Sequence, residues 1–433
     1  MLDKIFKKLE RFVPAKYRWI LNHDGFKRYF ANTGWMFSGQ MFSLLISFFI
    51  GAWLARYLGP ENYGVLSYAV AFVGLFGFIA SLGVDGILNR ELVKYPEKRD
   101  ELMGTAFKLK MIGGVLAFSL CIISAFIFKT TPLIKLLIIL FSFTYILQAI
   151  NVISIYFQSE VKSKNNVRAQ ILATIISSLL KVLVIMLDKG VIWIVVVYTL
   201  DSLWLGFFFI RSYNRFGLKL KTWKFNINLA KEILKNSWPL MLASAAWFIY
   251  VKIDQVMIGV MLGNYEVGLY AAAVKLVEAW YFIPGIICAS LFPAIINAKK
   301  TDPGIYRRRL KNLYILMIVT SVAIALPISL LAKPIIYILF GSGYLESVNV
   351  LRIYAWSSVG MFLNMAIYQY LISENFVKTI FWLNLIAMIV NVVLNLIFIP
   401  AFGLLGAAWA TLISYCVVPI VLVVITRMNI IKF

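Results

Sequence analysis

Apolar residues gather in long runs along this chain, and short polar connections separate one run from the next. A helix needs roughly 20 mostly apolar residues to cross the hydrocarbon core of a bilayer. The pattern therefore predicts about twelve membrane-spanning helices, in two sets of six separated by a polar break at 211–235. The expected spans are 33–58, 64–84, 108–128, 132–157, 167–187, 191–210, 237–262, 267–295, 313–332, 350–372, 379–399 and 403–426.

The composition supports a membrane environment. Of the 433 residues, 62% are hydrophobic and 14% are charged, and the mean hydropathy is +0.86. Soluble domains are nearer to 45–50% apolar and about 25% charged. A water-exposed fold of this chain would lack the polar surface to cover its core, so we expect an all-α integral membrane protein.

The chain contains an internal repeat. Leu58–Gly64 reads LGPENYG and Leu262–Gly268 reads LGNYEVG, at an offset of 204 residues. Lys27 and Lys231 share this offset. Both repeated hairpins start on the same side of the membrane, which predicts two six-helix lobes related by a pseudo-two-fold axis along the membrane normal. Gly59 and Gly263 are expected to supply a positive φ in the tight turn of each hairpin.

This repeat predicts the organisation of the chain. We expect a cytoplasmic amphipathic segment, an N-lobe with helices 1–6, a cytoplasmic linker and a C-lobe with helices 7–12, with a central cavity between the lobes. The corresponding residues are 1–31, 32–210, 211–235 and 236–433.

Charge predicts the orientation. The chain has 42 Lys and Arg against 19 Asp and Glu, a formal charge of +23. With the N-terminus inside, 33 of the basic residues fall in cytoplasmic segments or in the span ends beside them, and four in outer loops or the span ends beside those. Cytoplasmic loops of membrane proteins carry this excess, so both termini are predicted in the cytoplasm. Loop topology then explains the basic charge, and no nucleic-acid partner is expected.

Metal and redox chemistry find little support. Cys121, Cys288 and Cys416 lie in separate apolar runs without a Cys-x-x-Cys pair, and His23 is the one histidine. Such spacing does not suit a zinc or redox site. No set of nucleophile and base is visible either. We therefore expect no metal, no cofactor and no enzymatic activity.

Ionisable residues inside the predicted spans are candidates for function, because charge is costly in the bilayer. Lys252 and Asp254 lie on the seventh span, and Lys275 and Glu278 on the eighth, at similar depths from the hairpin centre near 265. We expect a network across this hairpin. Three interpretations stay open: cations that attract substrate, an ion-pair lock, and coupling to an ion.

Lys181 and Asp201 form a second expected pair, on spans five and six at matching depth. Arg56 lies near the outer end of the first span, where it either snorkels to headgroups or contacts substrate. Positive-inside topology explains the cytoplasmic arginines, and capture of an anionic headgroup is the alternative. These arginines are Arg90, Arg307, Arg308 and Arg309.

Neutral polar side chains in the spans have two interpretations, hydrogen bonds to sugar hydroxyls in a cavity and helix–helix packing. They include Ser38, Gln40, Ser43, Gln148, Asn151, Asn364 and Gln369.

The hairpin residues resemble a known family. Ala55–Gly64 (ARYLGPENYG) is similar to the first-hairpin signature of the Wzx-type polysaccharide flippases, the polysaccharide synthase family of the multidrug/oligosaccharidyl-lipid/polysaccharide exporter superfamily. Lys252–Gly259 (KIDQVMIG), followed by Gly268–Ala272 (GLYAA), resembles the second-half signature. The likeness extends over the whole chain in the number, length and order of spans.

The resemblance implies a function. A Wzx-type protein moves undecaprenyl-pyrophosphate-linked oligosaccharide units across the cytoplasmic membrane by alternating access, for surface polysaccharides such as the O-antigen of lipopolysaccharide. It implies contact with membrane lipids and a place beside a polymerase and a chain-length regulator. A monomer is expected, since one chain holds both lobes. The alternative is a cation-coupled exporter of small amphipathic compounds, in which Asp201 or Asp254 takes up a proton or a sodium ion.

Overall fold

The protein is a bundle of long helices. The computed structural model describes residues 24–128, 130–374 and 376–427, and this part of the chain contains no strand. The amphipathic helix expected in the first 31 residues lies largely outside it. In chain order the helices are α3 (Asp24–Gly74), α4 (Gly77–Ser81), α5 (Val84–Lys94), η2 (Pro96–Lys98), α6 (Arg99–Ile127), α7 (Pro132–Ser142), α8 (Thr144–Leu147), η3 (Gln148–Asn151), α9 (Val152–Ser159), α10 (Ser163–Met186), α11 (Gly190–Arg215), η4 (Leu220–Thr222), α12 (Ile227–Met261), α13 (Asn264–Glu278), α14 (Phe282–Thr301), α15 (Pro303–Leu330), α16 (Ala332–Phe340), η5 (Ser342–Tyr344), α17 (Ser347–Ser373) and α18 (Val377–Arg427).

Ten helical stretches in the described residues are long and apolar enough to cross a membrane. Two of them bend at a non-helical glycine, α3 at Gly59 (φ 68°) and α18 at Gly403 (φ 59°). Dividing both at these glycines gives the twelve predicted spans of a multi-pass membrane protein. Gly263 has φ 125°, so the positive φ expected at both repeated turns is confirmed.

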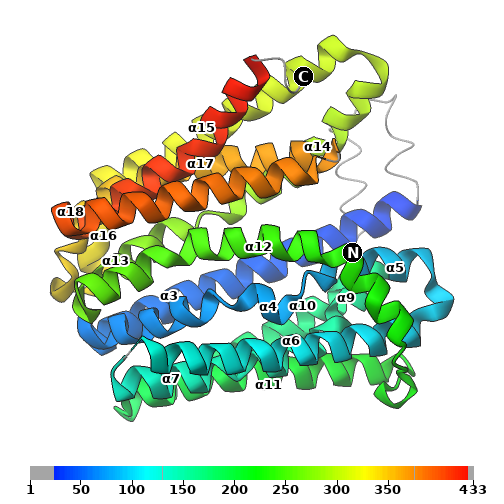
Figure 1. Cartoon of the computed structure of the whole chain (residues 1–433), viewed down its shortest axis with the longest axis horizontal. Helices are drawn as coiled ribbons and strands as arrows, with labels where there is room; N and C mark the ends of the chain where they lie inside the picture. Colours follow the sequence, from blue (N-terminus) through cyan, green and yellow to red (C-terminus); the bar gives the residue numbers. More distant parts are fainter. Residues whose placement is uncertain (1–23, 129, 375, 428–433) are drawn as a thin grey trace.

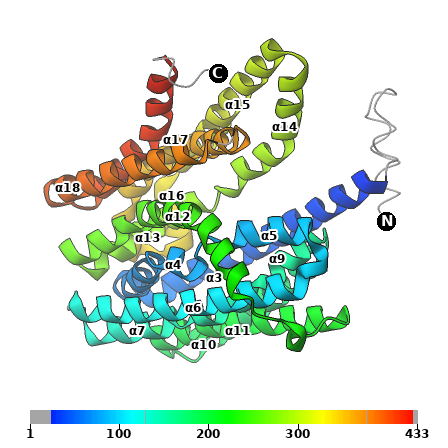
Figure 2. The ribbon, with the colours of Figure 1, turned by 45° about the vertical axis from the view of Figure 1, so that its right-hand side comes forward.

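The helices form two lobes (Figures 1 and 2). Helices α3 to α11 make up one, α12 to α18 the other, and α3, α12 and α13 run along the boundary between them. The repeated hairpins meet there through their own glycines. A Cβ atom on Gly64 would overlap the carbonyl oxygen of Asn264, and one on Gly268 would overlap that of Pro60. The two lobes therefore touch at residues that the 204-residue offset relates.

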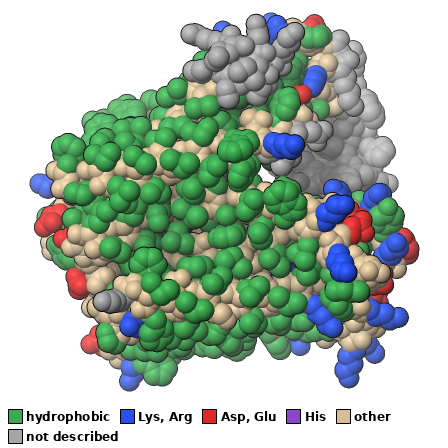
Figure 3. Space-filling model, viewed as in Figure 1, with side chains coloured by type: hydrophobic (Ala, Val, Ile, Leu, Met, Phe, Trp, Pro, Cys, Tyr) green, Lys and Arg blue, Asp and Glu red, His purple; other side chains and the backbone are tan. Residues whose placement is uncertain are grey.

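Basic residues mark one end of the bundle (Figure 3). Lys and Arg gather at the end where α5, the α11–α12 connection and the α14–α15 connection lie, which we call the basic end. The opposite end carries the turns at Gly59 and Gly263 and is called the hairpin end. There Tyr344 Oη donates to the carbonyl of Ala55 at 2.6 Å, which fastens the C-lobe to the N-lobe.

Three spans that the sequence predicts as continuous helices are broken. Residues 267–295 divide into α13 and α14, with a break at 279–281. Residues 64–84 contain the end of α3 and all of α4, and the chain turns again at Leu82 and Gly83, both with positive φ, before α5. Residues 132–157 divide into α7, α8, η3 and α9. Here Thr144 Oγ1 donates to the carbonyl of Phe141 at 2.7 Å, a side-chain bond of the kind that competes with the helical backbone.

Candidate functional site

Three adjoining cavities run through the protein from the basic end to the boundary of the lobes. The basic-end cavity has a volume of about 590 Å³, the N-lobe cavity about 330 Å³ and the central cavity about 340 Å³. Gln170 and Leu205 line both of the first two, and Ser47 and Tyr198 line both of the last two. The cavities therefore form one series along the N-lobe.

The basic-end cavity is walled by the end of α3, by α4 to α6, by α8 to α11 with η3, and by α12 of the other lobe. Lys110 Nζ lies 2.6 Å from Asp85 Oδ1, and only 9% of the lysine side chain is exposed. Gln148 and Asn151, two of the predicted polar candidates, line this cavity from η3. Sequence reasoning missed Lys110, although its place inside the third predicted span was a usable signal.

The N-lobe cavity holds the pair expected on spans five and six. Lys181 Nζ lies 3.0 Å from Asp201 Oδ2 and 3.8 Å from the centre of the Tyr198 ring. Gln40 and Ser43 line the same cavity. The predicted ion pair is thus confirmed, and one side chain satisfies the charge of the other.

The central cavity lies between the lobes and contains three charged residues. Lys252 Nζ of α12 is 3.6 Å from Glu278 Oε1 of α13. Lys275 forms no ion pair with any residue of the described chain. Its amino group rests against the backbone of Gly51 on α3, where an added Cβ would overlap it, and 5.9 Å from the centre of the Tyr63 ring.

Lys275 is therefore the exception among the charges of the three cavities. The other six side chains form three pairs between opposite charges, as far as the described residues show: Asp85 with Lys110, Lys181 with Asp201, and Lys252 with Glu278. A single cation at the boundary of the lobes gives the central cavity a net positive charge.

The network expected across the hairpin is present in part: Lys252 pairs with Glu278, but Asp254 and Lys275 do not join them. Residues two apart on an α-helix point about 200° away from each other, so Asp254 faces the C-lobe while Lys252 faces the cavity. Asp254 is 4% exposed. It accepts hydrogen bonds from Asn395 Nδ2 at 2.6 Å, from Tyr270 Oη at 3.0 Å and from Thr411 Oγ1.

The predicted arginines do not line these cavities. Arg56 is exposed at the hairpin end. Arg90 pairs with Glu91 at 2.8 Å, and Arg309 Nη1 donates to the carbonyl of Ala294 at 2.7 Å. Arg307 and Arg308 belong to the first turns of α15 at the basic end.

The remaining polar candidates lie elsewhere. Asn364 is buried and donates to the carbonyl of Tyr415 at 3.1 Å, while Ser38 and Gln369 are exposed.

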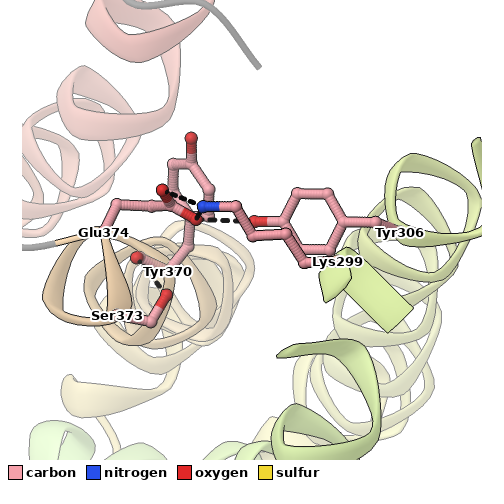
Figure 4. Close-up of polar contacts among 5 residues, drawn as sticks. All are labelled: Lys299, Tyr306, Tyr370, Ser373 and Glu374. Carbon is pink, nitrogen blue, oxygen red and sulfur yellow. Dashed lines mark hydrogen bonds and ion pairs between the residues drawn. The ribbon is translucent and has the colours of Figure 1, made fainter. Parts of the chain in front are cut away.

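A further ionic cluster, which sequence reasoning missed, ties three helices of the C-lobe together at the basic end (Figure 4). Lys299 Nζ of α14 donates to both carboxylate oxygens of Glu374, at 2.7 and 2.5 Å. Tyr306 Oη of α15 donates to the same carboxylate at 3.1 Å. Glu374 caps α17, so the cluster holds the α14–α15 hairpin against that helix.

Comparisons with known proteins match this architecture. A family model described as polysaccharide biosynthesis protein matches residues 29–299. An uncharacterized membrane protein of Methanocaldococcus jannaschii is 27% identical over 192 residues, 44% of each chain. A probable low-salt glycan biosynthesis flippase of Haloferax volcanii is 24% identical over 205 residues, 45% of this chain and 43% of that one. The chain thus aligns with less than half the length of either relative.

Solved structures share the fold. An inward-facing multidrug resistance MATE family transporter of the MOP superfamily gives a TM-score of 0.73 at 15% identity, over 90% of this chain and 94% of the other. The lipid II flippase MurJ, in an inward closed conformation, gives 0.70 at 18% identity, over 90% of this chain and 86% of the other.

Proposed function

The chain belongs to the polysaccharide biosynthesis protein family, and from this premise we propose that it flips lipid-linked oligosaccharides across a membrane by alternating access. The proposed substrate is a glycan joined through pyrophosphate to a polyprenyl lipid of the undecaprenyl class. The glycan and the pyrophosphate pass through the cavities, while the lipid tail stays in the bilayer. The protein acts as a transporter and not as an enzyme.

Lys275 is the observation that carries this proposal. A pyrophosphate loses its hydration when it enters a cavity inside the membrane, which is costly unless a cation and hydrogen-bond donors replace the water. The cations of the three pairs are already neutralised by carboxylates. Lys275 has no such partner among the described residues, so its charge is available to an anionic headgroup at the boundary of the lobes.

The packing of the lobes supports alternating access. They are closed at the hairpin end by the Gly64–Gly268 crossing, whereas the basic-end cavity lies among α5, α6 and α9. Positive-inside topology places the basic end in the cytoplasm. We therefore assign this conformation to the loading state, and the opposite state requires the hairpins to separate. The flipped glycan then reaches the polymerase and the chain-length regulator of its pathway.

Asp254 supports coupling to a proton or to a sodium ion. It is buried in the C-lobe without a cationic partner in the described chain, and amide and hydroxyl groups surround it. Asn395 Oδ1 is buried beside it without a hydrogen-bond partner in the described structure. A carboxylate with neighbouring neutral oxygens is a donor set that hard cations accept. Asp254 and Asn395 are thus the proposed coupling residues.

A cation-coupled exporter of small amphipathic compounds is the competing function. It would use the same Asp254, but it gives no reason for an unpaired cation in the central cavity. Measuring the accumulation of amphipathic dyes in cells that overexpress the protein separates the two. A flippase leaves dye accumulation at the level of cells without the protein.

Gene deletion and complementation test the proposal. We expect lipid-linked glycan to accumulate in the cytoplasmic leaflet of deleted cells, and native protein to clear it. Lys275→Met should clear it poorly and Lys275→Arg better, because arginine keeps the charge. Lys333→Met removes an exposed lysine of α16 and serves as the matched control. Deleted cells without accumulation, and with intact surface polysaccharide, would overturn the proposal.

A further inference from the structure

The amides that line the basic-end cavity are unusual because nothing in the described protein engages them. Besides Asn89 of α5, four amide side chains line this cavity: Gln148 and Asn151 of η3, Gln158 of α9 and Gln170 of α10. Along the described ranges 24–128, 130–374 and 376–427, none of these four side chains forms a hydrogen bond. Each carries one acceptor oxygen and two N–H donors, so a dense set of donors and acceptors is open to a ligand.

Amides elsewhere in the bundle behave differently. Asn166 donates to the carbonyl of Ser154 at 2.8 Å, Asn364 to that of Tyr415 at 3.1 Å, and Asn391 to Ser414 Oγ at 3.2 Å. These are the bonds by which polar side chains hold membrane helices together. Since the four cavity amides form none of them, helix packing does not explain why they are there.

The backbone at η3 orients two of these amides. In a 3₁₀-helix, residues three apart lie above one another on the same side, so Gln148 and Asn151 project together. Tyr145 Oη, in the preceding turn, donates to the carbonyl of Val73 at 2.6 Å and anchors this segment to α3. The break in the fourth span therefore places a pair of amides on a fixed wall of the cavity.

The basic-end cavity is also electrically balanced. Among the described residues its lining includes only two charged side chains, Asp85 and Lys110, which pair with each other. An acidic group bound there would find no free cation, in contrast to the central cavity with Lys275. Its volume of about 590 Å³ falls in the roughly 300–1,000 Å³ range of small-molecule sites.

We propose that the basic-end cavity is a binding compartment for uncharged sugars, hexoses and N-acetylhexosamines, of the lipid-linked glycan. The amides bind hydroxyl and acetamido groups, while Lys275 binds the pyrophosphate in the central cavity. The N-lobe cavity connects these two cavities. This inference rests on the proposed function and adds selectivity to it. Neutral sugars are favoured over uronic acids because the described residues of the compartment carry no unpaired charge.

Binding to the full chain in lipid nanodiscs tests the inference with three probes. These are farnesyl pyrophosphate, an N-acetylglucosamine conjugate and a glucuronic acid conjugate, and both conjugates carry an oligosaccharide long enough to extend from the central cavity through the N-lobe cavity, ending in the sugar that names it. Native protein should prefer the N-acetylglucosamine conjugate to the other two. In the double variant Gln148→Leu with Asn151→Leu, the ratio of affinities that expresses this preference should fall about tenfold, because two or more hydrogen bonds are removed. The double variant should bind farnesyl pyrophosphate as native protein does.

The control is Gln369→Leu, which removes an exposed amide of α17 outside the three cavities and should leave all three affinities unchanged. Unaltered binding of farnesyl pyrophosphate shows that the double variant is folded. A double variant with the native preference, or native protein that prefers the glucuronic acid conjugate, overturns the inference.

Two outcomes separate the inference from the proposed function. If Lys275→Met weakens all three probes while the amide variant changes nothing, the sugar compartment is wrong and the headgroup role of Lys275 stands. If native protein binds none of the probes, the proposed function fails, and the sugar compartment fails with it.

Discussion

Charged side chains inside the bundle have two different roles. Lys181 with Asp201, and Lys252 with Glu278, satisfy one another across neighbouring helices, while Lys275 stands without a partner in the described structure. A buried pair gains little net stability over apolar packing, yet removing one member leaves a costly uncompensated charge. Pairing is therefore the structural use of these charges, and the missing partner of Lys275 is what suits it to an anionic substrate.

The Lys181–Asp201 pair yields a stability prediction. Lys181→Met should lower the midpoint of thermal unfolding, by the equivalent of about 1–3 kcal/mol, because it leaves Asp201 unpaired in the membrane. The double variant Lys181→Met with Asp201→Asn should lie closer to the native midpoint than Lys181→Met alone. Differential scanning fluorimetry of purified protein measures this. Strictly additive effects of the two substitutions would show that the pair is not coupled.

Asp254 yields a prediction about coupling. Asp254→Asn removes the charge and keeps much of the shape, so transport should lose its dependence on an imposed proton or sodium gradient. Asp188→Asn is the matched control, since Asp188 is exposed and accepts a hydrogen bond from Tyr57 at 2.7 Å at the hairpin end. A gradient dependence that survives in Asp254→Asn would exclude this residue as the coupling site.

The sequence indicates which charges matter but not how they combine. Distance from a hairpin turn gives the depth of a residue in the membrane, and this sufficed for Lys181 and Asp201. It does not give the direction in which a side chain points. Lys252 and Asp254 have similar depths and opposite directions, and Tyr270, Asn395 and Thr411 join Asp254 through contacts that no spacing in the sequence reveals.

At the scale of elements, the repeated hairpins are the contact on which the two lobes close. Gly64 and Gly268 bring two backbones together at a distance that leaves no room for a side chain. This contact follows from the repeat, because related residues meet near a two-fold axis. The glycines therefore act in the closure of the hairpin end, in addition to the turns at Gly59 and Gly263.

Substitution of Gly64 or Gly268 by alanine should destabilise the closed hairpin end. The new Cβ would meet backbone atoms, which cannot rotate away, and overpacking of this kind costs roughly 1–3 kcal/mol. Ser67 lines the central cavity and provides a reporter as Ser67→Cys in a chain with its native cysteines replaced by alanine. Its reaction with an impermeant maleimide from the hairpin end should become several-fold faster.

Gly285→Ala is the control for this experiment, because nothing lies within 4 Å of a Cβ at that position. It should leave the rate of labelling at the native level. Equal rates in the native, Gly64→Ala and Gly285→Ala backgrounds would contradict a gate at the hairpin crossing.

Elements with a strong apolar pattern could be predicted, and those set by local backbone chemistry could not. The repeated hairpins follow from their glycines and their shared offset. The break at η3 contains no glycine or proline from which it could be predicted. It depends on hydroxyl groups such as that of Thr144. Helix α16 is nine residues long. Because this is too short to cross a membrane, the apolar pattern predicted most of it as part of a loop.

At the scale of the whole molecule, the lobes and the distribution of charge define a direction. The cavities lead from the basic end toward the lobe boundary, and the hairpin end is closed. We propose that this direction runs from the cytoplasm outward, because Lys and Arg are in excess in the segments predicted to be cytoplasmic. In the proposed transport cycle the two lobes rock about their shared contact.

Labelling of single cysteines tests the orientation. Glu97→Cys in η2 and Glu61→Cys at the hairpin end are both exposed positions and replace the same residue type. In intact cells an impermeant maleimide should label Glu61→Cys, and Glu97→Cys only after permeabilisation. The reverse pattern would place the basic end outside.

The most direct measurement is transfer of a lipid-linked glycan in reconstituted vesicles. Vesicles with polyprenyl-pyrophosphate-linked oligosaccharide in both leaflets are treated with an impermeant glycosidase, and the cleaved fraction is followed with time. Native protein and Lys333→Met should raise this fraction from the outer-leaflet share toward completion, and Lys275→Met should slow the rise by about tenfold. A cleaved fraction that stays at the level of protein-free vesicles would contradict the account.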